Sequence, residues 1–349
     1  MDLDAFFAAV EVLEDPRLAG KPLIVGGRPE ARGVVATASY AARRFGVHSA
    51  MPTYRALQLC PEALILPTRH TLYRRYSQRV MAILHETSSV VEKVSIDEAY
   101  LDLRERVTAW AEGEAIARRI QTRVREEVGL SASLGVATNK LVAKVASDHE
   151  KPSGLTVVRP GEEAAFLAPL DVRVIWGVGP VTAERLAGLG VTTVGDLART
   201  PEEDLSRTLG DHGVALRDRA RGIDRRPVVT EHERKSVSQE RTFKTDLRDL
   251  RALKVQLWQM SQQVARRLNR DQEAARTIGI KLRYADFETL TRQMQLDVPT
   301  AEAKMIYQAA LVLLREHWDR REAIRLLGVS AQQLCAPSPQ MRLFEGPYG

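Results

Sequence analysis

Three carboxylates are the residues of this sequence best suited to chemistry: Asp2 near the start and the adjacent pair Asp97 and Glu98. Neighbouring residues of a strand face opposite sides, so Asp97 and Glu98 can act together only at a turn or bulge. The alternating segment VVEKVSIDEAYLDL (residues 90–103) predicts a hairpin with the pair near its turn. Taken alone, such a turn is more often simply solvated. If Asp2 ends a neighbouring strand, however, the carboxylates supply the hard oxygen ligands that Mg²⁺ prefers, and two such ions assist in-line phosphoryl displacement.

A second group of residues could bind phosphates. Tyr40 and Arg43 are three residues apart on a predicted helix start and therefore share a face, and Lys151 follows a helix-like run. Together they could clamp a triphosphate, although each alone is more often an ordinary surface residue. Gly177 and Gly179 precede a predicted helix in a segment that resembles a helix-hairpin-helix. They either let backbone N–H groups approach a phosphate or simply form a tight turn.

Composition and spacing exclude several other classes of protein. The chain of 349 residues is 44% hydrophobic, which predicts two to four folded domains, and it has no apolar run long enough for a membrane span. Its seven histidines form no metal-spaced pair, and Cys60 and Cys335 lie far apart, which disfavours a zinc or disulfide-based protein and favours the reducing cytoplasm. No P-loop or dinucleotide-binding glycine motif occurs.

The predicted elements place these residues in several modules. We expect a short helix over 5–13 and a strand over 23–27, then a strand running into the helix that carries Tyr40. Packing helices are predicted over 72–86 and 113–127, with a further strand at SASLGVA. A charged linker precedes a βαββαβ unit, whose predicted elements are strand 236–243, helix 250–268, strands 276–284 and 291–298, helix 301–317 and strand 324–332.

The C-terminal unit carries the positive charge of the protein. Residues 234–349 contain 20 Lys and Arg against 13 Asp and Glu, although the formal net charge of the whole chain is only +6. In RTIGIKLRY, Ile278, Ile280 and Leu282 alternate with polar positions that include Lys281 and Arg283. This pattern predicts an apolar face toward the helices and a basic outer face that suits a phosphate backbone.

Six motifs in order resemble those of Y-family DNA polymerases of the DNA polymerase IV type, and the resemblance covers nearly the whole chain. The motifs are DLDAFFAAVE, VVATASYAARRFGV, SIDEAYLDL, GVATNKLVAKVASDHEKPSG, WGVGPVTAERLAGLG and KSVSQERTF. The resemblance implies an α+β multidomain fold of the right-hand polymerase type. Its parts would be a ferredoxin-like palm (1–5 and 69–158), small fingers (6–68), a helical thumb with a helix-hairpin-helix (159–222), a linker (223–233), a βαββαβ little finger (234–333) and a flexible tail (334–349).

The resemblance also assigns roles to individual residues. It implies that Asp2, Asp97, Glu98 and the backbone carbonyl of Leu3 bind two Mg²⁺ ions, with Mn²⁺ as an alternative, for nucleotidyl transfer from a dNTP to a primer 3′-OH. Phe7 would be the steric gate that excludes a ribose 2′-OH, whereas we expect Phe6 to belong to the core. The triphosphate contacts would be Thr37, Tyr40, Arg43 and Lys151, and the DNA contacts would include Gly177, Gly179, Lys281 and Arg283.

The same resemblance implies an error-prone translesion polymerase, because small fingers enclose the nascent base pair loosely. We expect the protein to be a monomer. We also expect no proofreading, because the sequence shows no second acidic cluster that could form an exonuclease site. In the tail, QMRLF (residues 340–344) resembles a peptide that docks on the sliding clamp through Gln340, Leu343 and Phe344. Besides the clamp, the expected partners are primer-template DNA and dNTPs.

One departure from the family concerns the first strand. Relatives have several strand residues before the first catalytic aspartate, whereas here Met1 directly precedes Asp2. The departure suggests a misassigned start or a truncated chain, and we expect a missing strand to loosen the site. Two alternatives to an active polymerase therefore stay open: a catalytically silent relative that binds DNA and the clamp, and a general nucleic-acid-binding protein. The second alternative leaves the predicted triphosphate residues unexplained.

Overall fold

The computed structural model describes residues 1–231, 233–319 and 322–337 and divides the chain into two compact units. The first unit comprises Met1–Gly27 and Val34–Glu231, and the second comprises Arg28–Gly33 and the residues from 232 onward. Within the described ranges, no helix is long and apolar enough to cross a membrane.

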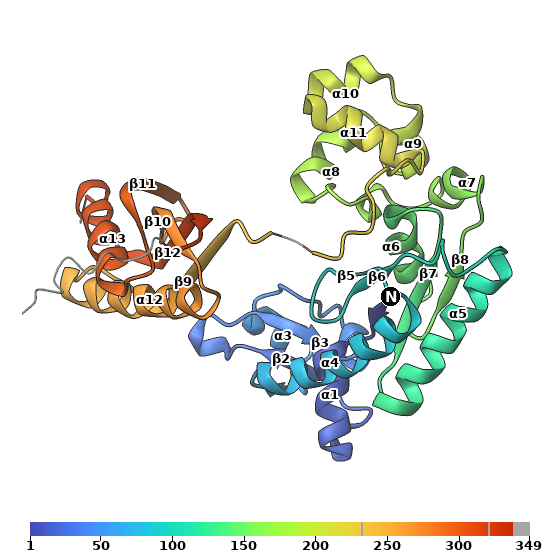
Figure 1. Cartoon of the computed structure of the whole chain (residues 1–349), viewed down its shortest axis with the longest axis horizontal. Coiled ribbons are helices and arrows are strands. Elements are labelled where there is room, and N and C mark those ends of the chain that lie inside the picture. The colour runs from blue at the N-terminus through green and yellow to red at the C-terminus, as the bar shows by residue number, and fades with distance from the viewer. Residues whose placement is uncertain (232, 320–321, 338–349) are drawn as a thin grey trace, which may run out of the picture. The chain divides into compact units, whose positions relative to one another are not determined.

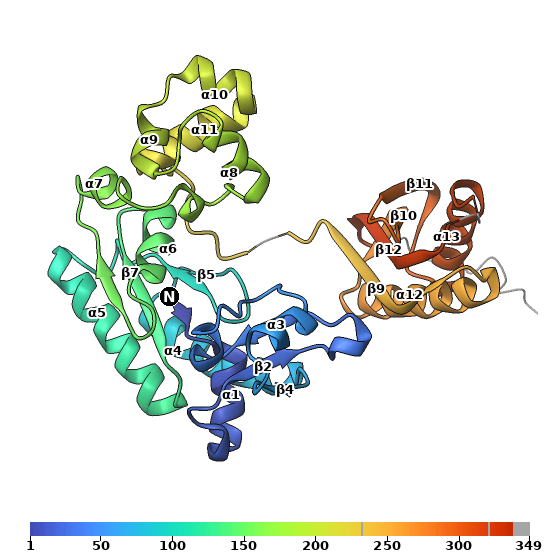
Figure 2. The same cartoon turned by 180° about the vertical axis from the view of Figure 1, so that it is seen from behind.

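The first unit contains a small three-stranded sheet beside the N-terminus, which is marked N in Figures 1 and 2. Asp2 lies in the first strand of this sheet. The strands around it are β1 (Asp2–Leu3), β5 (Val91–Lys93), β6 (Ala99–Leu101), β7 (Ala132–Val136) and β8 (Leu155–Val157). The sheet has the order β1-β7-β8, with β1 antiparallel to β7 and β7 parallel to β8. The hairpin β5-β6 lies on the other side of β1, joined to it by a bridge between Asp2 and Glu98.

Four helices belong to this part of the unit. They are α1 (Phe6–Glu14), α4 (His70–Thr87), α5 (Trp110–Arg123) with a π-helical turn at Val124–Val128, and α6 (Lys140–His149). The first three bury apolar faces in one core with the strands, including Phe6, Val80 and Ile120. The helices predicted over 72–86 and 113–127 are therefore confirmed, because their apolar residues recur at helical spacing on the buried side.

A second three-stranded sheet of the first unit packs one of its faces in a separate core. Its elements are β2 (Leu23–Gly26), β3 (Val35–Ala38), α2 (Tyr40–Arg43), α3 (Thr53–Leu59) and β4 (Leu64–Leu66). The strand order is β3-β2-β4, and the core contains Ile24, Val35, Ala56 and Cys60. Ser39 caps α2, because its hydroxyl accepts a hydrogen bond from the Ala42 N–H.

The region from 163 to 220 is helical and packs around a third core, which contains Leu186, Leu197 and Leu216. Its helices are α7 (Glu163–Leu167), α8 (Pro180–Ala187), α9 (Val194–Arg199), α10 (Glu202–Leu209) and α11 (Asp211–Ala220). A short 3-10 helix also lies in this region, at Val172–Val174, and two others occur earlier in the chain, at Pro16–Leu18 and Pro29–Ala31. A capping box formed by Thr193 and Asp196 starts α9.

The second unit is an antiparallel sheet with two helices packed against it (Figures 1 and 2). Its elements are β9 (Ser236–Leu247), α12 (Leu250–Arg270), β10 (Ala274–Tyr284), β11 (Thr289–Thr300), α13 (Ala303–His317) and β12 (Ile324–Cys335). The strand order is β11-β10-β12-β9. This confirms the predicted βαββαβ succession.

The alternation read in β10 is confirmed, since Ile278, Ile280 and Leu282 are buried in the core formed with the helices. The predicted boundary between the βαββαβ unit and the tail, at residue 334, was wrong. β12 continues to Cys335, into the segment assigned to the tail from residue 334. Pairing with β10 extends the strand, because Leu334 and Cys335 still lie opposite Ala275 and Ala274.

Candidate active site

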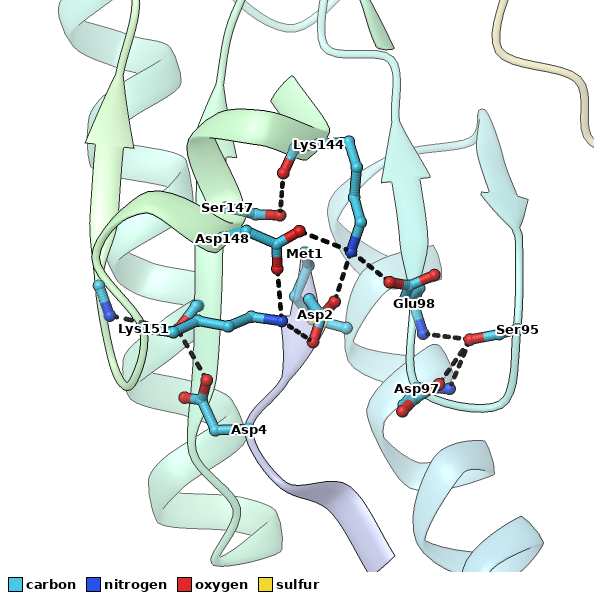
Figure 3. Close-up of polar contacts among 12 residues, drawn as sticks. Met1, Asp2, Asp4, Ser95, Asp97, Glu98, Lys144, Ser147, Asp148 and Lys151 are labelled. Atoms are coloured by element: carbon cyan, nitrogen blue, oxygen red, sulfur yellow. Dashed lines mark hydrogen bonds and ion pairs between the residues drawn. The ribbon is translucent and has the colours of Figure 1, made fainter. Parts of the chain in front are cut away.

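Tertiary structure brings Asp2 and Glu98 together around a lysine (Figure 3). Asp2 lies in β1 and Glu98 directly precedes β6, so the bridge between the strands places the two carboxylates side by side. Lys144 on α6 reaches between them, with its Nζ 2.7 Å from Asp2 Oδ2 and paired with Glu98 Oε1. Two carboxylates and one ammonium therefore form the centre of the site.

Asp97 lies in the expected turn, but its carboxylate is engaged elsewhere. The Ser95 hydroxyl donates to Asp97 Oδ1 at 2.5 Å and also accepts from the backbone N–H groups of Asp97 and Glu98 (Figure 3). The expected convergence of all three carboxylates is not seen, and the described residues contain no cluster of three metal-binding side chains. The reason is local, because Ser95 closes the turn and holds the Asp97 side chain on itself.

The electrostatics of the Asp2 and Glu98 pair favour a cation. Burial raises the pKa of Asp2, but hydrogen bonding with Glu98 and the attraction of Lys144 outweigh it and lower the pKa to about 2. Burial, followed by the neighbouring Asp2, raises the pKa of Glu98. Burial lowers the pKa of Lys144, but Asp2 and Glu98 reverse this effect and raise it above its usual value. The Lys144 ammonium thus occupies a position between the carboxylate oxygens of Asp2 and Glu98, which are hard donors of the kind that Mg²⁺ prefers.

A second lysine contacts Asp2 from the other side. The Nζ of Lys151 lies 2.6 Å from Asp2 Oδ1 and 2.7 Å from Asp148 Oδ1. Asp148 also pairs with Lys144 at 3.3 Å. Sequence reasoning identified Lys151 but missed Lys144 and Asp148. The signal was present, since Lys144 and Asp148 are four residues apart on a predicted helix and Lys151 follows three residues later.

Tyr40 and Arg43 share a face of α2 as predicted, with the Arg43 guanidinium 5.0 Å from the centroid of the Tyr40 ring. Arg43 Nε donates to the Ala38 carbonyl at 3.0 Å, and the Tyr40 hydroxyl donates to Asp4 Oδ1 at 3.3 Å. Burial, aided by Asp4, raises the pKa of Tyr40 to about 12, so the hydroxyl remains a donor. Thr37 is buried in the adjacent strand β3.

Phe6 and Phe7 differ as expected. Phe6 is 1% exposed and belongs to the core, which confirms its predicted role. Phe7 is partly exposed and stacks on Tyr73, with ring centroids 4.0 Å apart and planes 13° from parallel. The Tyr73 hydroxyl donates to Glu11 at 2.5 Å, so the ring behind Phe7 is fixed. Sequence reasoning missed Tyr73, because a buried helix residue carries no distinguishing mark.

Two of the predicted DNA contacts, Gly177 and Gly179, belong to the first unit, and the other two, Lys281 and Arg283, belong to the second. Gly177 has a positive φ of 103° and accepts a hydrogen bond from His212, and Gly179 immediately precedes α8. In β10, Lys281 pairs with Glu240 at 3.1 Å and Arg283 Nε donates to Thr289 at 2.8 Å. Gln340, Leu343 and Phe344, which are predicted to bind the sliding clamp, lie outside the described residues.

A cavity follows β1 at its N-terminal end. It has a volume of about 360 Å³ and is lined by Met1 and by residues of β6, α5 and β7, including Leu101, Trp110 and Val136. The pairing of β1 with β7, Asp2 opposite Ser133, places the cavity where β1 would continue beyond Met1. The Met1 ammonium donates to the Ala99 carbonyl at 2.9 Å, and burial lowers its pKa to about 6.

We expect five apolar, β-branched residues appended before Met1 to fill this cavity as a strand and to raise the free energy of unfolding by about 2 kcal/mol. The pKa of the amine falls from 8.0 to about 6 on folding, so the unfolded chain binds more protons between these values and stability rises with pH through that window. An extension replaces the amine with an amide and removes that dependence.

Urea denaturation at pH 6 and pH 8 measures both effects. A Gly-Ser extension of equal length is the control, because it removes the pH dependence without burying apolar side chains. Equal stability of the two extended proteins would contradict filling of the cavity.

Family models match three stretches of the chain. Residues 1–148 match the impB/mucB/samB family, residues 234–343 match the C-terminal domain of that family, and residues 160–191 match the IMS family HHH motif. DNA polymerase IV of Dehalococcoides mccartyi (strain CBDB1) is 43% identical over 98% of this chain and 88% of that protein. DNA polymerase IV of Listeria monocytogenes serotype 4b (strain CLIP80459) is 44% identical over 96% of this chain and 94% of that protein.

Solved structures of DNA polymerases are also similar to this chain. A Y-family DNA polymerase chimera of Dbh and Dpo4 has a TM-score of 0.87 and 32% identity, covering 96% of this chain and 98% of that one. DinB from Sulfolobus solfataricus has a TM-score of 0.64 and 32% identity, covering 95% of this chain and 97% of that one.

The chain therefore belongs to the impB/mucB/samB family, the Y family of DNA polymerases. It is a DNA-directed DNA polymerase of the translesion class, and its similarity is to the polymerases IV within that family. The predicted resemblance and the predicted right-hand polymerase fold are both confirmed.

Proposed function

We propose that the chain extends a DNA primer by two-metal nucleotidyl transfer at Asp2, Asp97 and Glu98. These carboxylates and the Leu3 carbonyl would hold two Mg²⁺ ions, with Mn²⁺ as an alternative, and the ions supply activation of the attacking hydroxyl and stabilisation of the leaving oxygen. The observation that carries the proposal is the Lys144 ammonium held between Asp2 and Glu98, which marks a position built for positive charge.

The other residues of the site position the substrates. Arg43, Tyr40 and Lys151 are proposed to bind the triphosphate of the dNTP, with Thr37 beside them, because guanidinium, hydroxyl and ammonium donors suit phosphate oxygens. The primer 3′-OH then attacks the α-phosphate and pyrophosphate leaves. Catalysis by these residues comes from holding the reacting groups in line and from compensating the charge of the triphosphate.

Mg²⁺-dependent primer extension on an undamaged primer-template tests the proposal. We expect dNTP incorporation by the chain and none by the Asp97→Ala, Glu98→Ala double variant, since a metal ligand set cannot survive the loss of two carboxylates. A folded, DNA-binding chain that incorporates nothing would contradict the proposal and support the catalytically silent alternative.

Phe7 is proposed to act as the steric gate, supported by its partly exposed ring and by the Tyr73 ring stacked behind it at 4.0 Å. We expect Phe7→Ala to lower discrimination against ribonucleotides at least about tenfold, because a truncated side chain no longer occupies the space of the 2′-OH. The ratio of kcat/KM for dCTP and CTP measures the effect. Unchanged discrimination, with dCTP incorporation retained, would contradict the gate.

The outer face of the second unit is proposed to bind the DNA backbone through Lys281 and Arg283, and Gly177 and Gly179 to bind it through backbone N–H groups. Lys281 and Glu240 lie on opposite sides of Gly328 in adjacent strands, and their ion pair spans the glycine, which has no side chain to block it. Glu240 thus competes with phosphate for Lys281.

We expect Glu240→Gln to tighten duplex binding several-fold and Lys281→Ala to weaken it, lowering the slope of log K against log salt by about 1. Fluorescence anisotropy over a salt series measures both. Glu316→Gln, which removes the same charge from α13 on the helical side of the sheet, is the matched control. If Glu240→Gln changes the affinity for duplex DNA no more than Glu316→Gln does, Glu240 does not compete with phosphate for Lys281.

The division into palm (1–5 and 69–158), fingers (6–68), thumb (159–222) and little finger (234–333) is proposed to hold here. The little finger has a core of its own, whereas the cores of the other regions cross these boundaries, since Phe6 packs with palm residues and Val142 packs with thumb residues. We further propose synthesis by a monomer without proofreading, and clamp docking through Gln340, Leu343 and Phe344. A cytoplasmic location is proposed because Cys60 and Cys335 are both unpaired.

A further inference from the structure

Asp4 is a buried carboxylate that the proposed mechanism leaves without a role. It is 4% exposed and directly follows β1, which carries Asp2 and Leu3. An ionised carboxylate offers about four acceptor sites, and buried acceptors need partners. Asp4 has four donors, and they come from three separate segments of the chain.

The donors divide evenly between the two oxygens. Oδ1 accepts from the Ser133 hydroxyl at 2.8 Å and from the Tyr40 hydroxyl at 3.3 Å. Oδ2 accepts from the Ser131 hydroxyl at 2.6 Å and from the Ser153 backbone N–H at 2.8 Å. Asp4 therefore joins the β7 region, helix α2 and the turn after Lys151.

Backbone strain marks the turn as a place where such support is needed. Ser153 has a positive φ of 58°, a left-handed conformation that is strained for a residue with a side chain. The bond from its N–H to Asp4, and the contact of its hydroxyl with Ser131 at 2.6 Å, compensate for that strain. Two residues earlier in the same turn, Lys151 reaches Asp2 at 2.6 Å.

We propose that Asp4 is a positioning residue for the incoming nucleotide: in the free protein it holds Tyr40 and the Lys151 turn in the geometry that receives the triphosphate, and the single Tyr40 O–H turns from Asp4 to a phosphate oxygen when the nucleotide binds. The inference rests on the proposed function, which assigns Tyr40 and Lys151 to the triphosphate. One carboxylate thereby aligns the triphosphate contacts with the strand that carries Asp2 and Leu3. Asp4 acts through these residues and does not touch the nucleotide.

The test measures the dissociation constant of a non-hydrolysable dNTP analogue on the enzyme bound to primer-template DNA. We expect Asp4→Ala to raise this constant at least about tenfold, while the dissociation constant of the DNA itself changes less than about twofold. Asp4→Asn should restore most of the affinity, because its amide oxygen can accept from Ser153 and Ser131 and its amino group can donate to the two remaining hydroxyls.

Glu92→Ala serves as a matched control for stability. Glu92 is also buried, at 6% exposed, and pairs with Lys140 at 2.8 Å outside the nucleotide-contacting residues. We expect it to lower the melting temperature as Asp4→Ala does, without weakening nucleotide binding. If Asp4→Ala weakens nucleotide binding no more than Glu92→Ala does, the inference is wrong. Should Asp4→Ala not fold, Ser131→Ala removes a single donor and should produce a smaller rise in the same constant.

A double-mutant cycle separates this inference from the proposed function. If Asp4 acts through Lys151, the Asp4→Ala, Lys151→Ala double variant should lose less affinity than the two single losses predict together. Additive losses would overturn the positioning role and leave the triphosphate contact intact. An unchanged dissociation constant in Lys151→Ala alone would instead overturn the triphosphate assignment.

Discussion

Asp2→Asn is expected to lower primer extension by more than about 100-fold. A loss of this size exceeds the loss of up to about 100-fold that follows removal of a group that only supports a metal ligand. The pKa of Asp2, about 2, keeps its carboxylate charged at neutral pH, and Asn cannot supply that charge. Two ammonium groups, those of Lys144 and Lys151, would then face an uncharged amide at 2.7 and 2.6 Å. Single-turnover incorporation of one dNTP measures the loss.

Asp148→Asn is the matched control for this prediction. Asp148 pairs with the same two lysines, at 3.3 and 2.7 Å, but is half exposed and is not a proposed metal ligand. We expect it to change incorporation only a few-fold, since exposed ion pairs contribute about 1 kcal/mol or less. Equal losses in the two variants would show that Asp2 serves only to hold the lysines.

Gly135→Ala is expected to destabilise the protein by about 3 kcal/mol, at the upper end of what overpacking costs. A Cβ at Gly135 would lie 2.1 Å from the Ala143 carbonyl oxygen and 2.6 Å from the Ser147 nitrogen. Both are backbone atoms of α6, so relief requires the whole helix to move away from β7. Because α6 carries Lys144, we also expect the variant to lose activity under conditions in which it is still folded.

Gly113→Ala tests whether this effect is specific to Gly135. Gly113 lies in α5 near the same sheet, and its Cβ would meet only Val136 Cγ1, at 3.8 Å. Alanine favours a helix over glycine by about 1 kcal/mol, so this variant should be slightly more stable than the parent. Urea denaturation measures both variants. A Gly135→Ala protein as stable as the parent would contradict the close approach of α6.

Much of the fold follows from local patterns in the sequence. The alternation of Ile278, Ile280 and Leu282 predicts the buried face of β10, and helical spacing predicts α4 and α5, because strand and helix periods act within a few residues. The boundary of β12 could not be predicted in this way. Its last two residues are held by pairing with β10, about 60 residues earlier in the chain.

The same distinction between local sequence and tertiary structure applies to the site. The sequence by itself determined which groups are present: carboxylates at Asp2, Asp97 and Glu98, and donors at Tyr40, Arg43 and Lys151. Only the tertiary structure decided that Lys144 lies between Asp2 and Glu98, that Asp97 turns to Ser95, and that Asp4 collects four donors. Except at the Ser95 turn, these contacts join residues 36 to 149 positions apart, and their geometry depends on strand register and on how closely α6 packs against the sheet.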